Sequence, residues 1–223
     1  MGKGVQVINK IPPIAKKYKQ HKAYKNYFDS FKDYYEEVYK LLPKSKKTLD
    51  IGCAYGTLAL MMKLRGDDVV ASDMNETYIN TKMLKDQGIE FQKINIEKTD
   101  IRGKYDLITL TETLEHLNSN PLEPLRRIFN ALEVGGHLFV STVMKEVHGD
   151  TTSMNGGEKG LWNDLLSWRK IPEYKGKWKD QHTFHYDQYN LVTLLVEAGF
   201  EIEEIGNINN FSHYLIGKKC LKA

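Results

Sequence analysis

A short apolar run that leads into a glycine-rich turn constrains the fold of this chain more than any other feature. Residues 48–56 read Thr-Leu-Asp-Ile-Gly-Cys-Ala-Tyr-Gly, and apolar residues typical of a helix follow. Glycines let a backbone approach a ligand closely, and the amides at a helix N-terminus attract polar or anionic groups. Asp73 follows a second apolar run at 69–71, a position where a carboxylate can accept both hydroxyls of a ribose. Together the turn and the acid predict an adenosine-type ligand.

Two familiar nucleotide-binding motifs are excluded at this turn. The dinucleotide motif Gly-x-Gly-x-x-Gly is broken, because Ala54 stands between Gly52 and Gly56 and Leu58 takes the place of the third glycine. No Gly-Lys-Ser/Thr follows, which excludes a Walker phosphate loop. Asp50, just before the first glycine, suits a ligand that carries an amino group and a cationic centre, whereas it would repel a pyrophosphate.

Strand and helix patterns alternate after residue 47. Strands are expected at 48–51, 69–71, 91–96, 107–110, 137–142, 200–205 and 213–218, and helices at 57–64, 75–87, 124–132 and 187–198. Such alternation predicts a doubly wound α/β fold with a mostly parallel sheet covered on both faces.

We expect a single domain over residues 1–223 with four parts. Residues 1–47 form an N-terminal helical cap, 48–142 the cofactor-binding half, 143–184 a substrate lid insertion, and 185–223 a C-terminal helix with two strands. The insertion holds all three tryptophans, Trp162, Trp168 and Trp178, which would form either an aromatic wall over a substrate or the core of a small cap.

Charge is distributed unevenly along the chain. Residues 1–47 carry twelve lysines and four acids, a net charge of +8, so the remainder carries −5 of the overall +3. A basic arm favours a polyanion such as nucleic acid as partner, although a solvated lysine-rich helix is the commoner explanation. Two distant cysteines, no signal peptide and no 18-residue apolar run favour a cytoplasmic protein without a membrane partner.

Six ordered segments of this sequence resemble the class I S-adenosylmethionine-dependent methyltransferases. They read Leu-Asp-Ile-Gly-Cys-Ala-Tyr-Gly from Leu49, Ala-Ser-Asp from Ala71, Tyr-Asp-Leu-Ile-Thr-Leu from Tyr105, Leu-Glu-His-Leu from Leu114, Gly-Gly-His-Leu-Phe-Val-Ser-Thr from Gly135, and Glu-Ala-Gly-Phe from Glu197. The resemblance implies a Rossmann-like seven-stranded sheet whose last strand is antiparallel. It also implies S-adenosylmethionine as methyl donor and S-adenosylhomocysteine as product.

The resemblance assigns a set of cofactor contacts. The turn would cradle the methionine part, Asp50 its amino group, Asp73 the ribose and Met74 the adenine, while Thr111 would approach the methionine end. An acid often found near the third strand is replaced here by Asn95, so Glu97 is the alternative partner of the adenine amine. The predicted cofactor-binding residues are Asp50, Gly52, Cys53, Ala54, Tyr55, Gly56, Asp73, Met74, Asn95, Ile96 and Thr111.

Residues that could act on the methyl acceptor follow the fourth expected strand. Glu112, Glu115 and His116 are spaced to face one way on a helical turn, and His182 and His185 return from the insertion. The predicted catalytic residues are His116, His182 and Glu112. In two branches of the resembling family, Glu-x-x-Glu-His and a later His are associated with a divalent metal; the sequence favours hydrogen-bonding roles instead, and no residue is assigned as a metal ligand.

The sequence thus predicts an enzyme that methylates a hydroxyl of a small metabolite or sugar. Two alternatives stay open. The basic N-terminal segment and the Glu-x-x-Glu-His run suit an RNA 2′-O-methyltransferase, and a non-catalytic S-adenosylmethionine-binding protein would keep the same cofactor residues.

Overall fold

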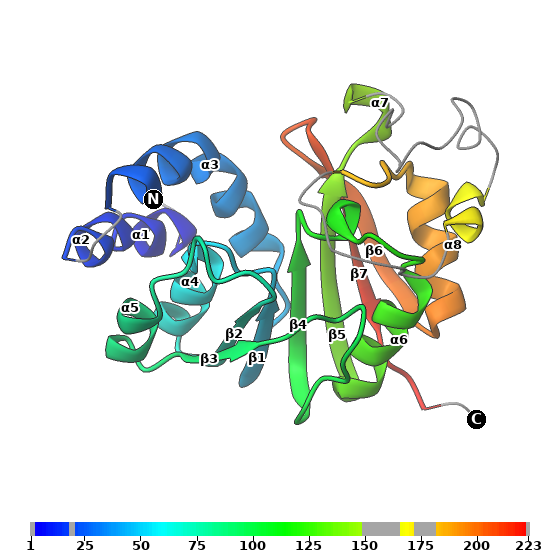
Figure 1. Ribbon diagram of the computed structural model, residues 1–223, viewed down its shortest axis with the longest axis horizontal. Coiled ribbons are helices and arrows are strands. Elements are labelled where there is room, and N and C mark those ends of the chain that lie inside the picture. The colour runs from blue at the N-terminus through cyan, green and yellow to red at the C-terminus, as the bar shows by residue number, and fades with distance from the viewer. Residues whose placement is uncertain (1–2, 18–20, 149–165, 172–181, 222–223) are drawn as a thin grey trace. The chain divides into compact units, whose positions relative to one another are not determined.

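The computed structural model describes residues 3–17, 21–148, 166–171 and 182–221. Its contacts divide the chain into two compact units, Met1–Ile94 and Asn95–Ala223. The strands form a seven-stranded sheet in the order β3-β2-β1-β4-β5-β7-β6, with the elements labelled in Figure 1. This order and the flanking helices confirm the predicted α/β class.

The first unit contains three parallel strands and five helices among its described residues. Its elements are α1 (Lys3–Ile8), α2 (Ile11–Ala15), α3 (His21–Leu41), β1 (Lys47–Ile51), α4 (Thr57–Arg65), β2 (Asp68–Asp73), α5 (Thr81–Asp86) and β3 (Glu90–Lys93). β2 pairs in parallel with β1 and with β3. Both α1 and α3 pack against α4.

The second unit contains the other four strands. Its elements are β4 (Tyr105–Thr111), the 3₁₀ turn η1 (Leu114–His116), α6 (Leu122–Ala131), β5 (Leu132–Val143), α7 (Lys145–His148), η2 (Ser167–Lys170), α8 (Gln188–Ala198), β6 (Glu201–Ile208) and β7 (Ser212–Lys218). β4 and β5 are parallel, and β7 runs antiparallel to both β5 and β6. The antiparallel last strand matches the expectation from the resemblance.

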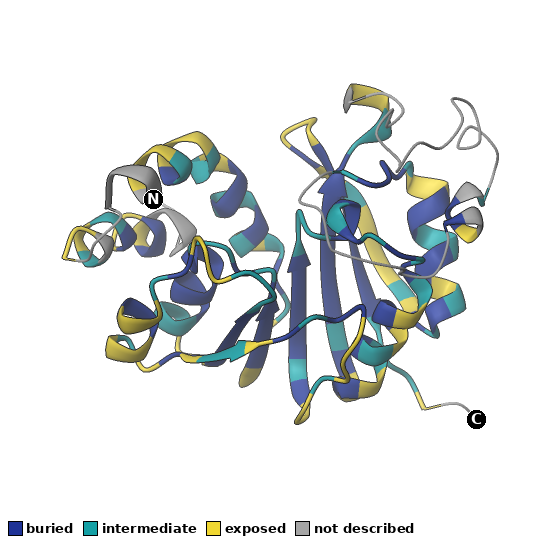
Figure 2. Cartoon of the chain, in the orientation of Figure 1, coloured by how far each residue is buried: buried dark blue, intermediate teal, exposed yellow. Residues whose placement is uncertain are grey.

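Buried apolar residues explain why the strands lie at the centre of each unit. β1, β2, β4 and β7 are buried along nearly their whole length, as the dark blue arrows of Figure 2 show. Such continuous burial is expected of strands covered on both faces. β6 is mostly exposed at the edge of the sheet, where Glu201, Glu203 and Glu204 protect its open edge from pairing with another chain.

Three expected element boundaries are wrong. The helix expected at 75–87 is reduced to α5, because Asn80 caps a helix that begins only at Thr81 by accepting a hydrogen bond from the Met83 amide. The strand expected at 91–96 ends at Lys93, because Asn95 begins a turn. The fifth strand starts at Leu132 rather than His137 and runs through the two glycines that were expected to end the preceding helix.

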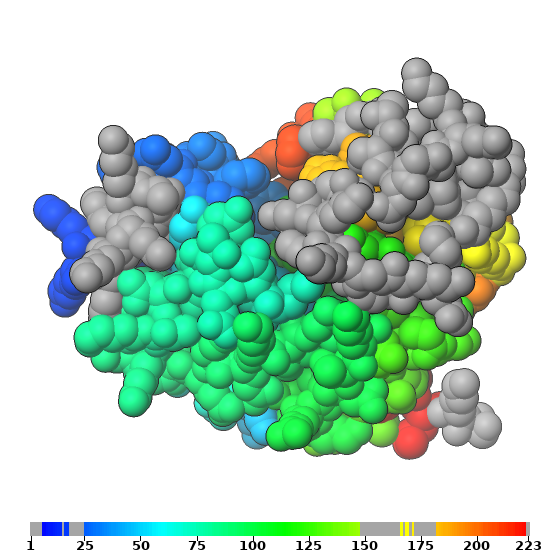
Figure 3. Space-filling view, viewed as in Figure 1, coloured from blue at the N-terminus to red at the C-terminus, as the bar shows by residue number. Residues whose placement is uncertain are grey.

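The segment around α5 lies on the surface of the first unit, where Figure 3 shows it in bluish green. Most of the predicted lid at 143–184 lies outside the described residues, including Trp162 and Trp178. Trp168 is described in η2 and is only 1% exposed, which suits the core of a cap better than a substrate wall. No helix among the described residues has the length and apolar character needed to cross a membrane.

Candidate functional site

The glycine-rich turn after β1 has a backbone that L-amino acids rarely adopt. Gly52, Ala54 and Gly56 have φ values of 72°, 44° and 76°. The Cys53 amide donates to the Ser72 carbonyl at 3.0 Å, and the Gly56 amide donates to the Cys53 carbonyl at 2.7 Å. These bonds hold the turn against the end of β2. The cost of alanine at position 54 therefore lies in its positive φ, whereas the sequence suggested only the size of its methyl group.

Gly56 is required by packing as well as by conformation. It is the N-cap residue of α4, and a Cβ at this position would lie 2.8 Å from Cδ2 of Leu84. Leu84 comes from α5 and is fully buried. The glycine therefore lets α5 approach the start of α4.

Asp73 connects the end of β2 to the turn. One carboxylate oxygen accepts the Ala54 amide at 3.1 Å and the other accepts the Asn75 amide at 2.8 Å. A carboxylate has about four acceptor positions, so two amide donors do not by themselves exhaust it. Met74, the predicted adenine contact, is half-buried beside it.

Asp50 and Cys53 form the floor of the turn. Asp50 is only 1% exposed at the buried end of β1. Burial raises the pKa of the Cys53 thiol well above its usual range, and the charges of Asp50 and Asp73 raise it further. The cysteine therefore stays a neutral thiol.

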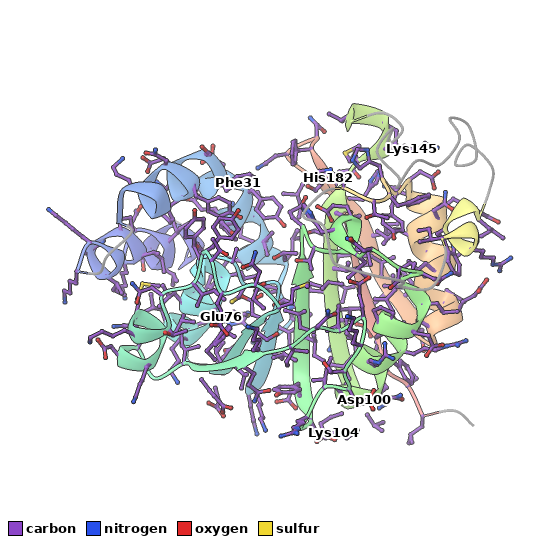
Figure 4. All side chains as sticks on the ribbon, viewed as in Figure 1. Phe31, Glu76, Asp100, Lys104, Lys145 and His182 are labelled. Atoms are coloured by element: carbon purple, nitrogen blue, oxygen red, sulfur yellow. The ribbon has the colours of Figure 1, made fainter. Side chains whose placement is uncertain are left out.

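An aromatic cluster covers the turn, and we define this cluster as Tyr27, Phe31, Tyr35, Tyr55 and Tyr78. Helix α3 supplies the first three of these side chains. The ring of Tyr55 in the turn lies 4.8 Å from Tyr27 and 5.4 Å from Tyr78, centroid to centroid. Tyr27 and Tyr35 are joined by a 3.2 Å hydrogen bond between their hydroxyls, and Phe31 is labelled in Figure 4. Burial raises the pKa of Tyr35 well above its usual range, with smaller contributions from Tyr27, Tyr34 and Asp50.

The sequence assigned only Tyr55 of this cluster to the site. A weak signal was available, because aromatic residues recur at helical spacing along α3. The pattern does not show which part of the first unit the helix covers. Contacts between α3 and α4 and the Tyr27–Tyr55 pair show that it is the glycine turn.

The second unit begins with a tight turn that engages Asn95. Its side-chain oxygen accepts the Glu97 amide at 2.9 Å, and its carbonyl accepts the amides of Lys98 and Thr99. Asn95 thus stabilises the turn with the atom that would otherwise meet an adenine amine. Glu97 is 9% exposed and accepts a 2.7 Å hydrogen bond from Ser119 on one oxygen, while its other oxygen has no partner among the described residues.

A cluster of a carboxylate and two imidazoles follows β4. One potential ligand atom from each of Glu115, His116 and His182 lies within 4.8 Å of the other two. The rings of His116 and His182 meet edge to face with centroids 4.7 Å apart. Glu115 is 1% exposed and accepts a hydrogen bond from the Thr142 hydroxyl at 3.0 Å. Figure 4 shows His182 near the carboxyl ends of β4 and β5.

Glu112 does not share a helical turn with Glu115 and His116, which is a correction to the expected spacing. It has a φ of 45° and precedes η1. Burial raises the pKa of Glu115 well above its usual range, and the nearby charge of Glu112 raises it further. Thr111, the last residue of β4, is half-buried and pairs with Ser141.

Two residues around the cluster, Thr142 and Thr183, were not assigned a role from the sequence. Thr142 closes β5 and binds Glu115, and the Thr183 amide donates to the Glu115 carbonyl at 2.6 Å. A buried polar residue at the end of an apolar strand was the available signal for Thr142. His185 accompanies His182 with ring nitrogens 2.8 Å apart.

The donor set of this cluster suits a divalent cation. A carboxylate oxygen and two imidazole nitrogens are ligands that zinc, iron and manganese accept. Burial and the neighbouring charge of Glu112 disfavour the ionised form of Glu115, and a bound cation would favour that form. The donor atoms of the cluster therefore fit a divalent metal ion, although the sequence did not favour metal binding.

Comparison with known proteins points to one family. A family model described as "Methyltransferase domain" matches residues 20–205. A ubiquinone biosynthesis O-methyltransferase from Acinetobacter baylyi is 32% identical over 120 residues, covering 51% of this chain and 50% of that protein. The chain thus spans about half the length of the curated relatives it matches.

Solved structures share the fold at low identity. An S-adenosylmethionine-dependent methyltransferase from Mesorhizobium loti has a TM-score of 0.58 at 16% identity, covering 82% of this chain and 97% of that chain. The [4+2]-cyclase SpnF has a TM-score of 0.60 at 15% identity, covering 85% of this chain and 82% of that chain. One fold therefore carries more than one reaction, and the chemistry has to be argued from the site.

Proposed function

Because the chain belongs to the methyltransferase domain family, within the class I S-adenosylmethionine-dependent methyltransferases, we propose that it transfers a methyl group from S-adenosylmethionine to a hydroxyl of a small acceptor. The proposal of a hydroxyl as methyl acceptor rests on the cluster of Glu115, His116 and His182. A hydroxyl must lose its proton as it is methylated, and the cluster offers groups suited to that task.

The first unit supports the cofactor part of the proposal. Asp73 is held by two backbone amides at the end of β2, where a carboxylate can accept the hydroxyls of a ribose. Asp50 is buried beneath the turn, where a carboxylate would attract the amino group and the sulfonium of the donor. The aromatic cluster over the turn would exclude water from a bound methionine portion.

The second unit supports the acceptor part. In the proposed reaction the acceptor oxygen forms a bond to the methyl carbon while the carbon–sulfur bond breaks, and S-adenosylhomocysteine leaves. The acceptor proton passes to His116 or His182, since imidazole titrates near neutral pH. Glu115, oriented by Thr142, would hold these rings. The name of the Acinetobacter relative, an O-methyltransferase, agrees with a hydroxyl as acceptor.

We also propose that Glu115, His116 and His182 hold a divalent cation, with Glu112 close by. A cation bound there would lower the pKa of a hydroxyl that it contacts. With a cation bound, the two histidines would act as neutral nitrogen ligands instead of bases and Glu115 as a negative ligand, and the acceptor proton would leave to water.

The test is methyl transfer from methyl-labelled S-adenosylmethionine to a panel of phenols, catechols and sugars. The wild-type chain should label a hydroxyl and release S-adenosylhomocysteine, and His116→Gln should lower kcat by about 10²-fold or more. His137→Gln is the matched control, because His137 pairs with Glu203 on the surface, outside the cluster.

Other results would redirect the proposal. Labelling of an RNA 3′-terminal ribose in place of every small acceptor would favour the RNA alternative, for which affinity should fall steeply with salt and upon neutralising the exposed residues Lys16 and Lys17. Full activity after exhaustive treatment with a chelator would rule out the cation proposal but would leave the proposal of a hydroxyl acceptor intact. Cofactor binding without labelling of any acceptor would favour a non-catalytic protein.

A further inference from the structure

A histidine pair lies next to the cluster. Nδ1 of His182 and Nε2 of His185 are 2.8 Å apart, with ring centroids at 5.0 Å and an interplanar angle of 79°. His185 is 8% exposed. The amide of Thr183, which lies between the two histidines, donates to the Glu115 carbonyl at 2.6 Å, so the pair is attached directly to the residue that holds the cluster's carboxylate.

A contact of this length between two ring nitrogens needs one proton between them. Two lone pairs would repel, and two N–H groups would collide. Two arrangements satisfy the contact. Either His182 carries its proton on Nδ1 and donates to His185, or His185 donates and His182 accepts at Nδ1.

The two arrangements differ at the other nitrogen of His182. If Nδ1 donates, Nε2 of a neutral His182 has a lone pair that can bind a cation or accept a proton. If Nδ1 accepts, Nε2 carries the hydrogen and can do neither. Histidines that bind metals usually donate their other ring N–H to a neighbouring acceptor, which sets the tautomer and the ring orientation. Only the first arrangement lets His182 bind a cation or accept a proton through Nε2.

We propose that His185 is a positioning residue that accepts the Nδ1 proton of His182 and thereby places the lone pair of His182 on Nε2. The inference rests on the proposed function, since it assumes that His182 acts through Nε2. It adds a residue that does not itself touch acceptor or cation, and it assigns one tautomer to His182.

Two substitutions at position 185 separate positioning from simple packing. In His185→Gln the amide oxygen lies where Nε2 of the histidine was and can still accept the proton. In His185→Phe the ring is kept and the acceptor is lost. Both variants fill the buried site, so a purely structural role predicts similar behaviour of the two.

The first readout is the affinity of the full chain for Zn²⁺ and Mn²⁺, measured by calorimetry without acceptor. His185→Phe should weaken binding by about 10- to 100-fold, as loss of an outer-shell partner does, while His185→Gln stays close to wild type. Affinity for S-adenosylhomocysteine, measured in parallel, should be unchanged in both variants. Equal metal affinity of His185→Phe and wild type would overturn the proposal.

The second readout is the tautomer of His182 by ¹⁵N NMR of the metal-free chain, with its signals assigned by their loss in His182→Gln. Wild type and His185→Gln should show the proton on Nδ1. A wild-type proton on Nε2 would overturn the inference, whatever the enzyme does. If no metal binds although the tautomer is as expected, the cation proposal fails and the positioning role is retained. These measurements also decide the case if His185→Phe does not fold.

Discussion

The backbone amide of Ala54 donates a 3.1 Å hydrogen bond to the carboxylate of Asp73. This bond connects the glycine turn after β1 with the acid after β2. An acid that the sequence suggests only as a ribose ligand thus also holds the loop that would cradle the methionine part. Ligand affinity and the stability of the turn should therefore change together when Asp73 is altered.

Asp73→Asn should lower both the affinity for the ligand and the stability of the turn. The amide group keeps one acceptor oxygen but turns an NH₂ toward one of the two backbone amides, so a part-buried donor loses its partner at a cost of about 1 kcal/mol. We expect at least a tenfold loss of affinity for S-adenosylmethionine by calorimetry and a lower urea midpoint. Asp68→Asn, at the exposed start of the same strand, is the control. Unchanged affinity in Asp73→Asn would contradict the cofactor assignment.

Gly56→Ala should destabilise the chain more than Gly66→Ala does. Both glycines have a positive φ, and each substitution costs about 1 kcal/mol in backbone conformation. At Gly66 a new Cβ meets nothing within 4 Å, whereas at Gly56 it lies 2.8 Å from buried Leu84. Overpacking of this kind costs roughly 1–3 kcal/mol more. Urea unfolding of the two variants measures the difference, and equal free energies of unfolding would show that α5 adjusts without cost.

Glu97→Gln tests the alternative partner of the adenine amine. The partner-free oxygen of Glu97 would accept from an exocyclic amine, and a 6-oxo base lacks that donor. Wild type should bind S-adenosylhomocysteine at least tenfold more tightly than S-inosylhomocysteine, and the ratio should shrink in Glu97→Gln. Ser119→Ala removes the other hydrogen bond of Glu97 and serves as a comparison. If Glu97→Gln leaves the ratio of the two affinities unchanged, the result would favour a backbone contact of Ile96 with the adenine amine.

Tyr214→Phe should change how stability depends on alkaline pH. Burial, together with the 2.6 Å hydrogen bond to Glu204, raises the pKa of Tyr214 to about 12. The native state therefore keeps a proton that the unfolded chain loses above pH 10, so this contribution is complete below pH 10 and is lost as pH rises through 12.

The substitution should lower the free energy of unfolding by about 1 kcal/mol at pH 8, and the gap to wild type should narrow as the pH rises. Urea titrations from pH 8 upward measure this. Tyr189→Phe, at a side chain that is 52% exposed, should change the free energy of unfolding by less than about 0.5 kcal/mol. A gap that stays constant with pH would mean that the hydroxyl is not held in the native state as described.

The sequence alone determined the features that depend on neighbours along the chain. Alternating apolar runs gave the order of strands and helices, since burial on both faces needs continuous apolar strands. The helix stops at Gly66 and Gly199 follow from the left-handed conformation that glycine adopts without cost. The turn after β1 and Asp73 were recognisable for the same local reason.

Tertiary structure decided which distant groups meet. The Asn95 side chain accepts the Glu97 amide within its own turn, a contact that the strand pattern did not show. Helix α3 covers the glycine turn, which its amphipathic pattern could not specify because every amphipathic helix buries one face. His182 reaches Glu115 and His116 because the Thr183 amide binds the Glu115 carbonyl. Such contacts depend on how the backbone hydrogen bonds of remote segments pair, and residue spacing within any one segment does not record that pairing.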